Sequence, residues 1–322
     1  MKVGILGSGA YGVALSDELN RVGNDVTLWT YSKVEKNMIS MIRKTPKLPG
    51  HEIDVNIFIT DEMEKAVDGK DLVIIAVPSY AFDSTVVLMS KFIKVKTPVI
   101  IATKGIPDEN CLFLHEIFVK HCKNPYGVIS GPTFASDIIR KIPVGYSLGT
   151  RSEIVEYTVK KCFENTDIKF RRTKDIIGIE ICAITKNIIA IAAGMLDGMD
   201  VSDSTRALFL TESLNDIKEL IEALGGDKKT ILSFAGFGDI LMTCTSKTSR
   251  NFSYGFLIGR SVNQEEIDYY LQTNTVEGLN GLKIITKALK KKKVKIPIIN
   301  LIYDIIVGKE DKSEIFRFLV DK

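Results

Sequence analysis

Lys186 and Asn187 interrupt an otherwise apolar stretch, residues 178–197. This stretch is apolar on every face, which predicts a helix that is buried on all sides. A buried ammonium group is costly unless it is paired with a carboxylate or loses its proton through a lowered pKa. From this helix alone, Lys186 is either a member of a structural ion pair or a catalytic group.

A carboxylate and an anion-binding group follow in the segment 236–251. Asp239 and Thr243 are four residues apart, so on a helix they share one face. Arg250 and Asn251 follow a turn rich in Ser and Thr, and the planar guanidinium of Arg matches the oxygens of a phosphate. Taken alone, Asp239 is equally consistent with a helix cap or a surface residue.

The N-terminus carries a glycine-rich loop, Gly7-Ser-Gly-Ala-Tyr-Gly12, between an apolar strand at 2–6 and a helix at 13–22. Strand, loop and helix in immediate succession form the context that a dinucleotide-binding loop needs. Gly7 permits a tight turn, Gly9 lets the backbone approach a pyrophosphate, and Gly12 lets helix and strand pack closely. The helix N-terminus offers N–H groups to the phosphates.

The end of the second strand, 25–29, bears on the choice of cofactor. NAD-binding proteins usually place a carboxylate there to hold the ribose 2′-hydroxyl. Here the chain continues Thr30-Tyr31-Ser32-Lys33, and the first acid is Glu35. The sequence therefore permits NADP as well as NAD.

Lys104 follows another apolar strand, 98–103, and the small-residue turn Ser130-Gly-Pro-Thr-Phe-Ala135 follows the strand 126–129. Ligands of open α/β sheets bind beyond the carboxyl ends of the strands. Lys104 is therefore placed where a ligand is expected, although most loop lysines are only surface residues.

The remaining pattern predicts the architecture. Further buried strands are expected at 56–59, 72–77, 143–149 and 167–171, with a helix at 153–163. Continuously apolar strands that alternate with helices indicate a Rossmann-type, mainly parallel, doubly wound sheet. From about residue 176 the pattern is helical, so we expect an α/β domain at 1–173 and an all-α domain at 174–322.

Composition excludes several classes of function. The net charge of +3 does not indicate a nucleic-acid-binding protein. Five scattered cysteines and three histidines predict neither a metal site nor a disulfide framework, which fits a reducing cytoplasm. No signal peptide is expected, and the run 176–196 is interpreted as a buried helix rather than a membrane span. The lysine-rich run 287–295 is interpreted as a solvated helix end.

Several motifs, in order along nearly the whole chain, resemble the NAD(P)-dependent glycerol-3-phosphate dehydrogenases of the bacterial type. Besides the glycine-rich loop these are Val77-Pro-Ser79, Thr103-Lys-Gly-Ile106, Ser130-Gly-Pro-Thr-Phe-Ala135, Lys186-Asn-Ile-Ile-Ala-Ile-Ala-Ala-Gly194, Gly236-Phe-Gly-Asp-Ile-Leu-Met-Thr-Cys-Thr-Ser246, Ser249-Arg-Asn251 and Val276-Glu-Gly278.

The resemblance implies a Rossmann-type domain followed by a helical domain like the C-terminal domain of 6-phosphogluconate dehydrogenase. It also implies reversible reduction of dihydroxyacetone phosphate to sn-glycerol 3-phosphate for phospholipid synthesis, by a possible homodimer. The implied catalytic residues are Lys186, Lys104 and Asp239. The implied substrate-binding residues are Lys104, Gly131, Thr133, Lys186, Asp239, Thr243, Ser249, Arg250 and Asn251, and the implied cofactor-binding residues are Gly7, Gly9, Ala10, Tyr11, Gly12, Tyr31, Lys104, Ala135, Arg250 and Glu277.

The chain departs from the family pattern at a few positions. Tyr31 stands where many members carry a basic residue, and Lys47 stands where a Tyr is common before Leu-Pro. Ser204 replaces a frequent Asn, and Glu212-Ser213 replaces Arg-Gly.

Three alternatives remain. Tyr157 and Lys161 match the YxxxK pattern of short-chain dehydrogenases, but we interpret them as surface neighbours on a helix. The β-hydroxyacid dehydrogenases share the two-domain plan, yet they carry Asn four residues after the Lys rather than directly after it. A cofactor-binding regulator without chemistry would lack a buried proton donor.

Overall fold

The computed structural model describes residues 1–106, 113–294 and 296–321. These residues form two compact units, one comprising 1–106 and 113–176 and the other starting at Ile177. Cys111, one of the five cysteines, and Lys295 of the lysine-rich run lie outside the described residues.

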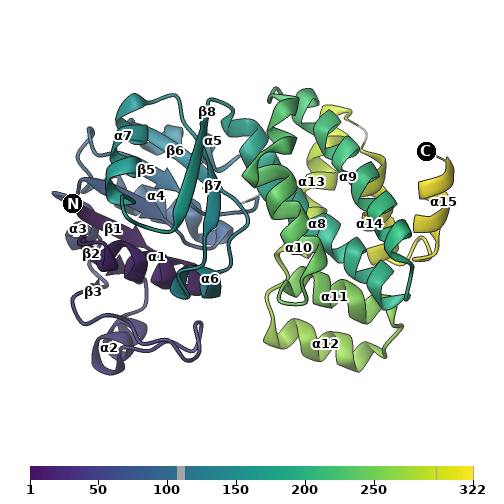
Figure 1. Ribbon diagram of the computed structural model, residues 1–322, viewed down its shortest axis with the longest axis horizontal. Helices are drawn as coiled ribbons and strands as arrows, with labels where there is room; N and C mark the ends of the chain where they lie inside the picture. Colours follow the sequence, from purple (N-terminus) through teal and green to yellow (C-terminus); the bar gives the residue numbers. More distant parts are fainter. Residues whose placement is uncertain (107–112, 295, 322) are drawn as a thin grey trace. The chain divides into compact units, whose positions relative to one another are not determined.

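An eight-stranded sheet organises the first unit, in the order β3-β2-β1-β4-β5-β6-β7-β8 (Figure 1). The strands are β1 (Lys2–Leu6), β2 (Asp25–Trp29), β3 (Phe58–Thr60), β4 (Leu72–Ile75), β5 (Val99–Ile101), β6 (Tyr126–Ser130), β7 (Val144–Gly149) and β8 (Ile168–Thr173). All neighbouring strands pair in parallel except β6 and β7. The expected Rossmann-type, mainly parallel sheet is therefore confirmed.

The antiparallel pair has a local cause. The chain between β6 and β7 contains one five-residue helix, α6 (Ala135–Ile139), and re-enters the sheet in the opposite direction. Such a connection needs no long crossover. The strand expected at 56–59 begins later, at Phe58, because the Asp54 carboxylate accepts a hydrogen bond from the backbone N–H of Asn56 and holds that segment in a turn.

Two groups of helices accompany the sheet. Helix α1 packs beside α6, whereas α4 packs beside both α3 and α5 (Figure 1). The helices of this unit are α1 (Ala10–Arg21), α2 (Lys33–Ile42), α3 (Met63–Val67), η1 (Ser79–Ala81), α4 (Phe82–Met89), α5 (Leu114–His121), α6 and α7 (Glu153–Cys162).

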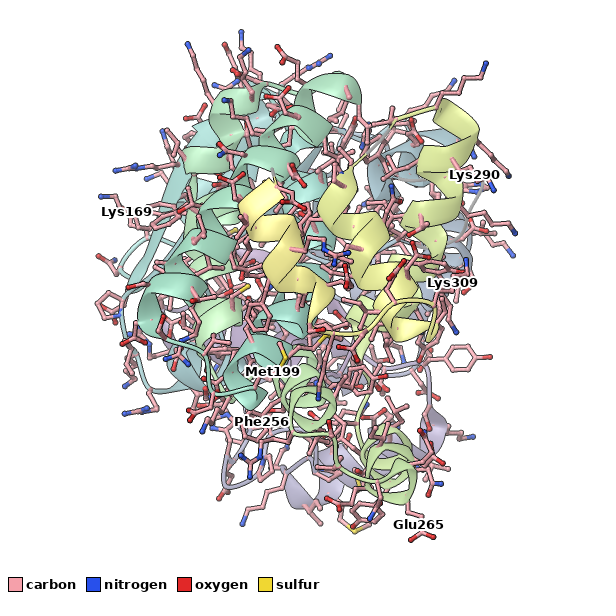
Figure 2. The ribbon with its side chains drawn as sticks, turned by 90° about the vertical axis from the view of Figure 1, so that its right-hand side faces the viewer. Lys169, Met199, Phe256, Glu265, Lys290 and Lys309 are labelled. Atoms are coloured by element: carbon pink, nitrogen blue, oxygen red, sulfur yellow. The ribbon has the colours of Figure 1, made fainter. Side chains whose placement is uncertain are left out.

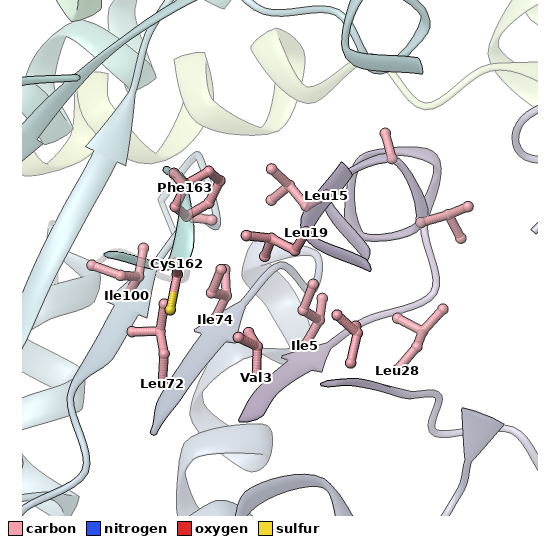
Figure 3. Close-up of a cluster of buried hydrophobic side chains, with 14 of the residues drawn as sticks. Val3, Ile5, Leu15, Leu19, Leu28, Leu72, Ile74, Ile100, Cys162 and Phe163 are labelled. Carbon is pink, nitrogen blue, oxygen red and sulfur yellow. The ribbon is translucent and has the colours of Figure 1, made fainter. Parts of the chain in front are cut away.

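The core on one side of the sheet joins strands to helices α1 and α7 (Figure 3). Strand side chains such as Val3 and Ile74 lie near Leu15 and Leu19 of α1, and Cys162 and Phe163 close the cluster. Burying an aliphatic side chain stabilises the fold by about 1.5–3 kcal/mol. This packing fixes α1, and with it the glycine-rich loop, against the carboxyl end of β1.

The second unit is helical throughout its described residues. Its elements are α8 (Ile176–Gly198), α9 (Asp203–Ala223), η2 (Lys228–Leu232), a π-helical turn η3 (Phe234–Gly238), α10 (Asp239–Thr245), α11 (Arg250–Gly259), α12 (Gln264–Thr273), α13 (Glu277–Lys292), α14 (Pro297–Ile306) and α15 (Glu314–Asp321).

Helix α8 is the central element of this unit. Among the described residues it is the one helix that is long and apolar enough to cross a membrane, and 94% of its apolar window is buried inside the protein. The prediction of a buried helix is confirmed. The lysine-rich run is a helix end, where Lys287, Lys290, Lys291 and Lys293 are exposed, and Figure 2 shows Lys290 at the edge of the unit.

Candidate active site

A buried ion pair lies at the middle of α8. The Lys186 Nζ donates a hydrogen bond to Asp239 Oδ1 at 2.7 Å and a longer one to Thr243 Oγ1 at 3.4 Å. The Lys186 side chain is 9% exposed and that of Asp239 is fully buried. Lys186 is thus paired, and the face shared by Asp239 and Thr243 on α10 is the face directed at it.

Helix α10 fixes the direction of these groups. The Thr243 hydroxyl donates to the backbone carbonyl of Asp239 at 2.6 Å, so its lone pairs are left to accept from Lys186. Gly236 has non-helical backbone angles in the turn before α10, and a Cβ there would lie 2.2 Å from the Ile231 carbonyl oxygen. The kink therefore requires glycine, and π-helical turns of this kind are frequent at functional sites.

Hydrogen bonds connect α8 to the starts of two further helices. Asn187 Nδ2 donates to Glu277 Oε2 at 3.2 Å, and Asn251 Oδ1 accepts from the Gly278 backbone N–H at 2.9 Å. Glu277 and Gly278 open α13, and Asn251 lies in the first turn of α11. The predicted residues Lys186, Asp239, Thr243, Asn251 and Glu277 are therefore linked within one unit.

Ser249 and Arg250 form the start of α11. The Ser249 hydroxyl caps the helix by accepting from the Phe252 N–H at 3.3 Å. Arg250 is the first helical residue and is exposed, while Asn251 is buried. Tyr270 of α12 donates to the Arg250 carbonyl at 3.0 Å, and burial raises the pKa of this phenol. An exposed guanidinium at a helix N-terminus is suited to bind an anion.

Glycines hold α8 against α11. A Cβ on Gly194 would lie 2.0 Å from the Phe252 carbonyl oxygen, and a Cβ on Gly255 would lie 1.8 Å from that of Ile191. The two backbones are therefore in direct contact. This contact sets the position of Asn251 and Arg250 relative to Lys186 on the other helix.

The glycine-rich loop lies in the first unit, at the carboxyl end of β1. Gly7 has φ +121°, and a Cβ on Gly12 would lie 1.9 Å from the Gly7 carbonyl oxygen, so both positions require glycine. Gly9 caps α1, and no atom of the described chain lies within 4 Å of the place of a Cβ there. Gly9, Ala10 and Tyr11 thus present the open first turn of α1, a shape that fits a pyrophosphate.

One neighbour of this loop was not predicted. Tyr11 donates its hydroxyl hydrogen to the hydroxyl of Tyr146 at 2.6 Å, and the two rings meet edge to face. Tyr146 lies on β7 and is fully buried. Because 135 residues separate the two tyrosines, the sequence alone offers no signal for this contact.

The residues after β5 and β6 also come together. Lys104 Nζ donates to the Gly131 carbonyl at 3.4 Å, and the Thr133 hydroxyl donates to the same carbonyl at 3.2 Å. Ala135 opens α6. The three residues Lys104, Gly131 and Thr133 therefore share one edge of the sheet. Tyr31, which follows β2, is 87% exposed.

The remaining residues that the sequence singled out lie on helices α7 and α9. Tyr157 is exposed on α7 and Lys161 pairs with Glu164, so the surface interpretation of the YxxxK pattern is confirmed. Ser204 is exposed on α9, while Ser213 is buried without a hydrogen-bond partner for its hydroxyl in the described chain. The described residues contain no cluster of His, Cys, Asp and Glu that could hold a metal ion.

The buried thiol of Cys244 and the cavity that it borders are separate from the predicted site residues. Burial raises the pKa of Cys244, which keeps the thiol protonated and unsuited to nucleophilic attack. A cavity of about 240 Å³ borders Cys244 together with Ala193, Leu196 and Phe209, and none of the predicted site residues lines it.

Comparisons with known proteins identify the family of this chain. A family model described as NAD-dependent glycerol-3-phosphate dehydrogenase N-terminus matches residues 2–154, and the corresponding C-terminus model matches residues 175–317. A glycerol-3-phosphate dehydrogenase [NAD(P)+] of Thermoanaerobacter sp. (strain X514) is 32% identical over 99% of this chain and 97% of its own length. That of Fusobacterium nucleatum is 31% identical over 98% of this chain and 95% of its own.

A solved structure extends the similarity to the fold. The crystal structure of glycerol-3-phosphate dehydrogenase from Coxiella burnetii superposes with a TM-score of 0.92 at 27% identity, and the match covers 100% of this chain and 99% of that one. Sequence and fold therefore agree over both units. This chain belongs to the family of NAD(P)-dependent glycerol-3-phosphate dehydrogenases.

Proposed function

We propose that this protein is an oxidoreductase that reversibly reduces dihydroxyacetone phosphate to sn-glycerol 3-phosphate with NADH or NADPH, and so supplies the backbone of glycerophospholipids. The observation that carries this proposal is the buried group of Lys186, Asp239 and Thr243, in a chain that belongs to this family. Reduction of a ketone needs a proton donor at the carbonyl oxygen, and a held ammonium group supplies one.

Lys186 is the proposed proton donor. An ammonium group has three N–H donors, and among the described residues Asp239 and Thr243 accept from it. The third N–H is then available to the substrate oxygen. As negative charge develops on that oxygen, Lys186 transfers a proton to it, and the hydrogen bond to Asp239 keeps the side chain oriented.

Arg250 and Asn251, with Ser249, are the proposed binding site for the substrate phosphate. They combine a guanidinium group with the N-terminus of α11, two features that favour a phosphate. This binding takes place away from the reacting carbon, so its energy orients the ketone toward Lys186. The close backbone contact between α8 and α11 at Gly194 and Gly255 fixes that orientation.

The first unit is the proposed cofactor-binding part. When bound, the nicotinamide cofactor supplies the hydride for the ketone carbon. Gly7, Gly9, Ala10, Tyr11 and Gly12 receive the pyrophosphate at the open N-terminus of α1. Tyr31, Ala135, Arg250 and Glu277 are proposed to contact other parts of the cofactor.

Lys104 is the proposed second cation of the reaction. It stabilises negative charge on the substrate electrostatically, and Gly131 and Thr133 contact the substrate beside it. We propose that residues 1–173 form the cofactor-binding domain and 174–322 the substrate-binding and catalytic domain. The exceptions are Lys104, Gly131 and Thr133, assigned to the substrate, and Arg250 and Glu277, assigned to the cofactor.

The cell compartment and the assembly are also part of the proposal. The described cysteines, Cys122, Cys162, Cys182 and Cys244, form no disulfide with one another, which favours a cytoplasmic enzyme. The resemblance favours a homodimer, which light scattering on the purified protein tests.

A spectrophotometric assay tests the proposed reaction. Oxidation of NADH and of NADPH is followed at 340 nm with dihydroxyacetone phosphate, with dihydroxyacetone, and with a β-keto acid. We expect turnover with the phosphorylated ketone and far less with the other two. Turnover with the β-keto acid alone would assign the chain to the β-hydroxyacid dehydrogenases, and cofactor binding without turnover would indicate a regulator.

A further inference from the structure

An ion pair lies beyond the carboxyl end of β2 in the first unit. Lys47, from the loop after α2, donates from Nζ to Glu35 Oε1 at 2.7 Å. The other carboxylate oxygen of Glu35 accepts from the hydroxyl of Thr30 at 3.1 Å. Thr30 directly follows β2, so the pair is tied to the end of that strand.

This position matters because the end of the second strand of a dinucleotide-binding sheet faces the ribose of the adenosine. A free carboxylate there holds the 2′-hydroxyl of NAD and repels the 2′-phosphate of NADP. In this chain Glu35 is the nearest acid after β2 in the sequence, and its charge is balanced by Lys47.

Exposure separates the two members of the pair. The Lys47 side chain is 49% exposed, whereas that of Glu35 is 19% exposed. Lys33, at the start of α2, is exposed as well. The exposed charges of this group, on Lys47 and Lys33, are therefore positive, whereas the negatively charged Glu35 side chain is half-buried.

From this arrangement we infer that the Glu35–Lys47 pair sets the preference between NADPH and NADH. Lys47 attracts the 2′-phosphate, and Glu35 opposes it by competing for the same ammonium group. This inference rests on one part of the proposed function, the binding of a nicotinamide dinucleotide by the first unit. The two residues act on the preference in opposite directions.

The opposite directions distinguish this role from a structural one. A pair that only tethered the loop to α2 would lose the same contact in either variant, and both variants would change cofactor binding in the same direction. A pair that acts through charge gives changes of opposite sign.

Equilibrium binding to the purified full-length protein tests the inference without turnover. The Kd values of NADPH and NADH are measured by cofactor fluorescence, and those of adenosine 2′,5′-bisphosphate and AMP by calorimetry. For Lys47→Gln we expect the Kd values of NADPH and adenosine 2′,5′-bisphosphate to rise about tenfold. Those of NADH and AMP should stay within about twofold of the wild-type values. For Glu35→Gln we expect the ratio of the NADPH to the NADH Kd to fall.

Lys161→Gln is the matched control, because Lys161 pairs with Glu164 and its side chain is also 49% exposed. It should leave both ratios unchanged. Equal weakening of both cofactors by Lys47→Gln, or a change of the ratio in the same direction by both variants, would overturn the inference. If the wild type binds NADPH but does not reduce dihydroxyacetone phosphate, the proposed function fails while the inference about the pair stands.

Discussion

Lys186 and Asp239 form a buried ion pair across two helices, with 2.7 Å between Nζ and Oδ1. Neither partner is well solvated, so each charge depends on the other for compensation. The pair belongs to the structure of the helical unit as well as to the proposed site. Its contribution to the free energy of unfolding and its contribution to turnover are measured in separate experiments.

Asp239→Asn leaves the ammonium group without its carboxylate and should lower the free energy of unfolding by about 3 kcal/mol, at the low end for breaking a buried pair. The variant Lys186→Met/Asp239→Asn, which removes both charges, should recover part of this loss. Urea unfolding followed by circular dichroism measures both. Asp203→Asn, which breaks an exposed pair with Arg206, is the control and should cost at most about 1 kcal/mol. Equal losses of stability in Asp239→Asn and Asp203→Asn would show that burial does not strengthen the dependence of the fold on the Lys186–Asp239 pair.

Gly255→Ala should separate α8 from α11, because the new methyl group would overlap the Ile191 carbonyl oxygen. We expect a loss of about 1–3 kcal/mol or more in stability, together with a raised KM for the phosphorylated substrate. Gly281→Ala on α13 is the matched control, since beyond its own turn of helix no described atom lies within 4 Å of that Cβ. It should raise stability by up to about 1 kcal/mol. A stable Gly255→Ala protein with normal KM would show that the close contact is unimportant.

Arg250→Ala should chiefly impair use of the phosphorylated ketone. Loss of a charge-assisted contact to phosphate is expected to raise KM by at least about tenfold, while the slow reduction of unphosphorylated dihydroxyacetone changes little. Arg260→Ala, at the exposed opposite end of α11, is the control. Both ketones are measured at saturating cofactor, because Arg250 is also proposed to contact the cofactor. Parallel losses with both ketones under that condition would place Arg250 outside the phosphate site.

Cys162 predicts a pH dependence of stability. Burial raises the pKa of this thiol to about 12, whereas the unfolded chain has an ordinary thiol pKa of about 8.5. The folded state holds the proton more tightly, so its contribution to stability is complete below about pH 8.5 and is lost as pH rises toward 12.

Urea unfolding at pH 8, 9 and 10 measures this effect. Above about pH 8.5 the thiol should remove up to about 1.4 kcal/mol of stability per pH unit. Cys162→Ala should show a correspondingly shallower decline. Val159→Ala, a buried truncation on the same helix, should decline as the wild type does. Identical slopes in all three proteins would refute the assignment.

Local sequence patterns were sufficient to predict most of the fold. Strands β1 and β2 have the predicted bounds, because each is a short run of mostly buried residues that is followed by a loop. The antiparallel direction of β7 was not predicted, since a period-two pattern carries no information on strand direction.

The candidate site was predicted in part. The spacing of Asp239 and Thr243 correctly placed them on one helical face, but their contact with Lys186 joins residues more than 50 positions apart. The residues alone left open whether Lys186 had a partner. The contact of Tyr11 with Tyr146 was missed for the same reason, since 135 residues separate the two. The contact of Glu35 with Lys47 spans only 12 residues, but the sequence marked Lys47 solely as a departure from the family pattern.

The turnover of Lys186→Met tests the central claim most directly, since methionine keeps the length of the side chain and removes its proton. Proton transfer of this kind typically contributes about 10²–10⁴-fold. With saturating NADH and dihydroxyacetone phosphate, we therefore expect kcat to fall by at least about 100-fold, while the Kd of NADH stays within about twofold of the wild-type value. An unchanged kcat in the folded variant would contradict the role of Lys186 as proton donor.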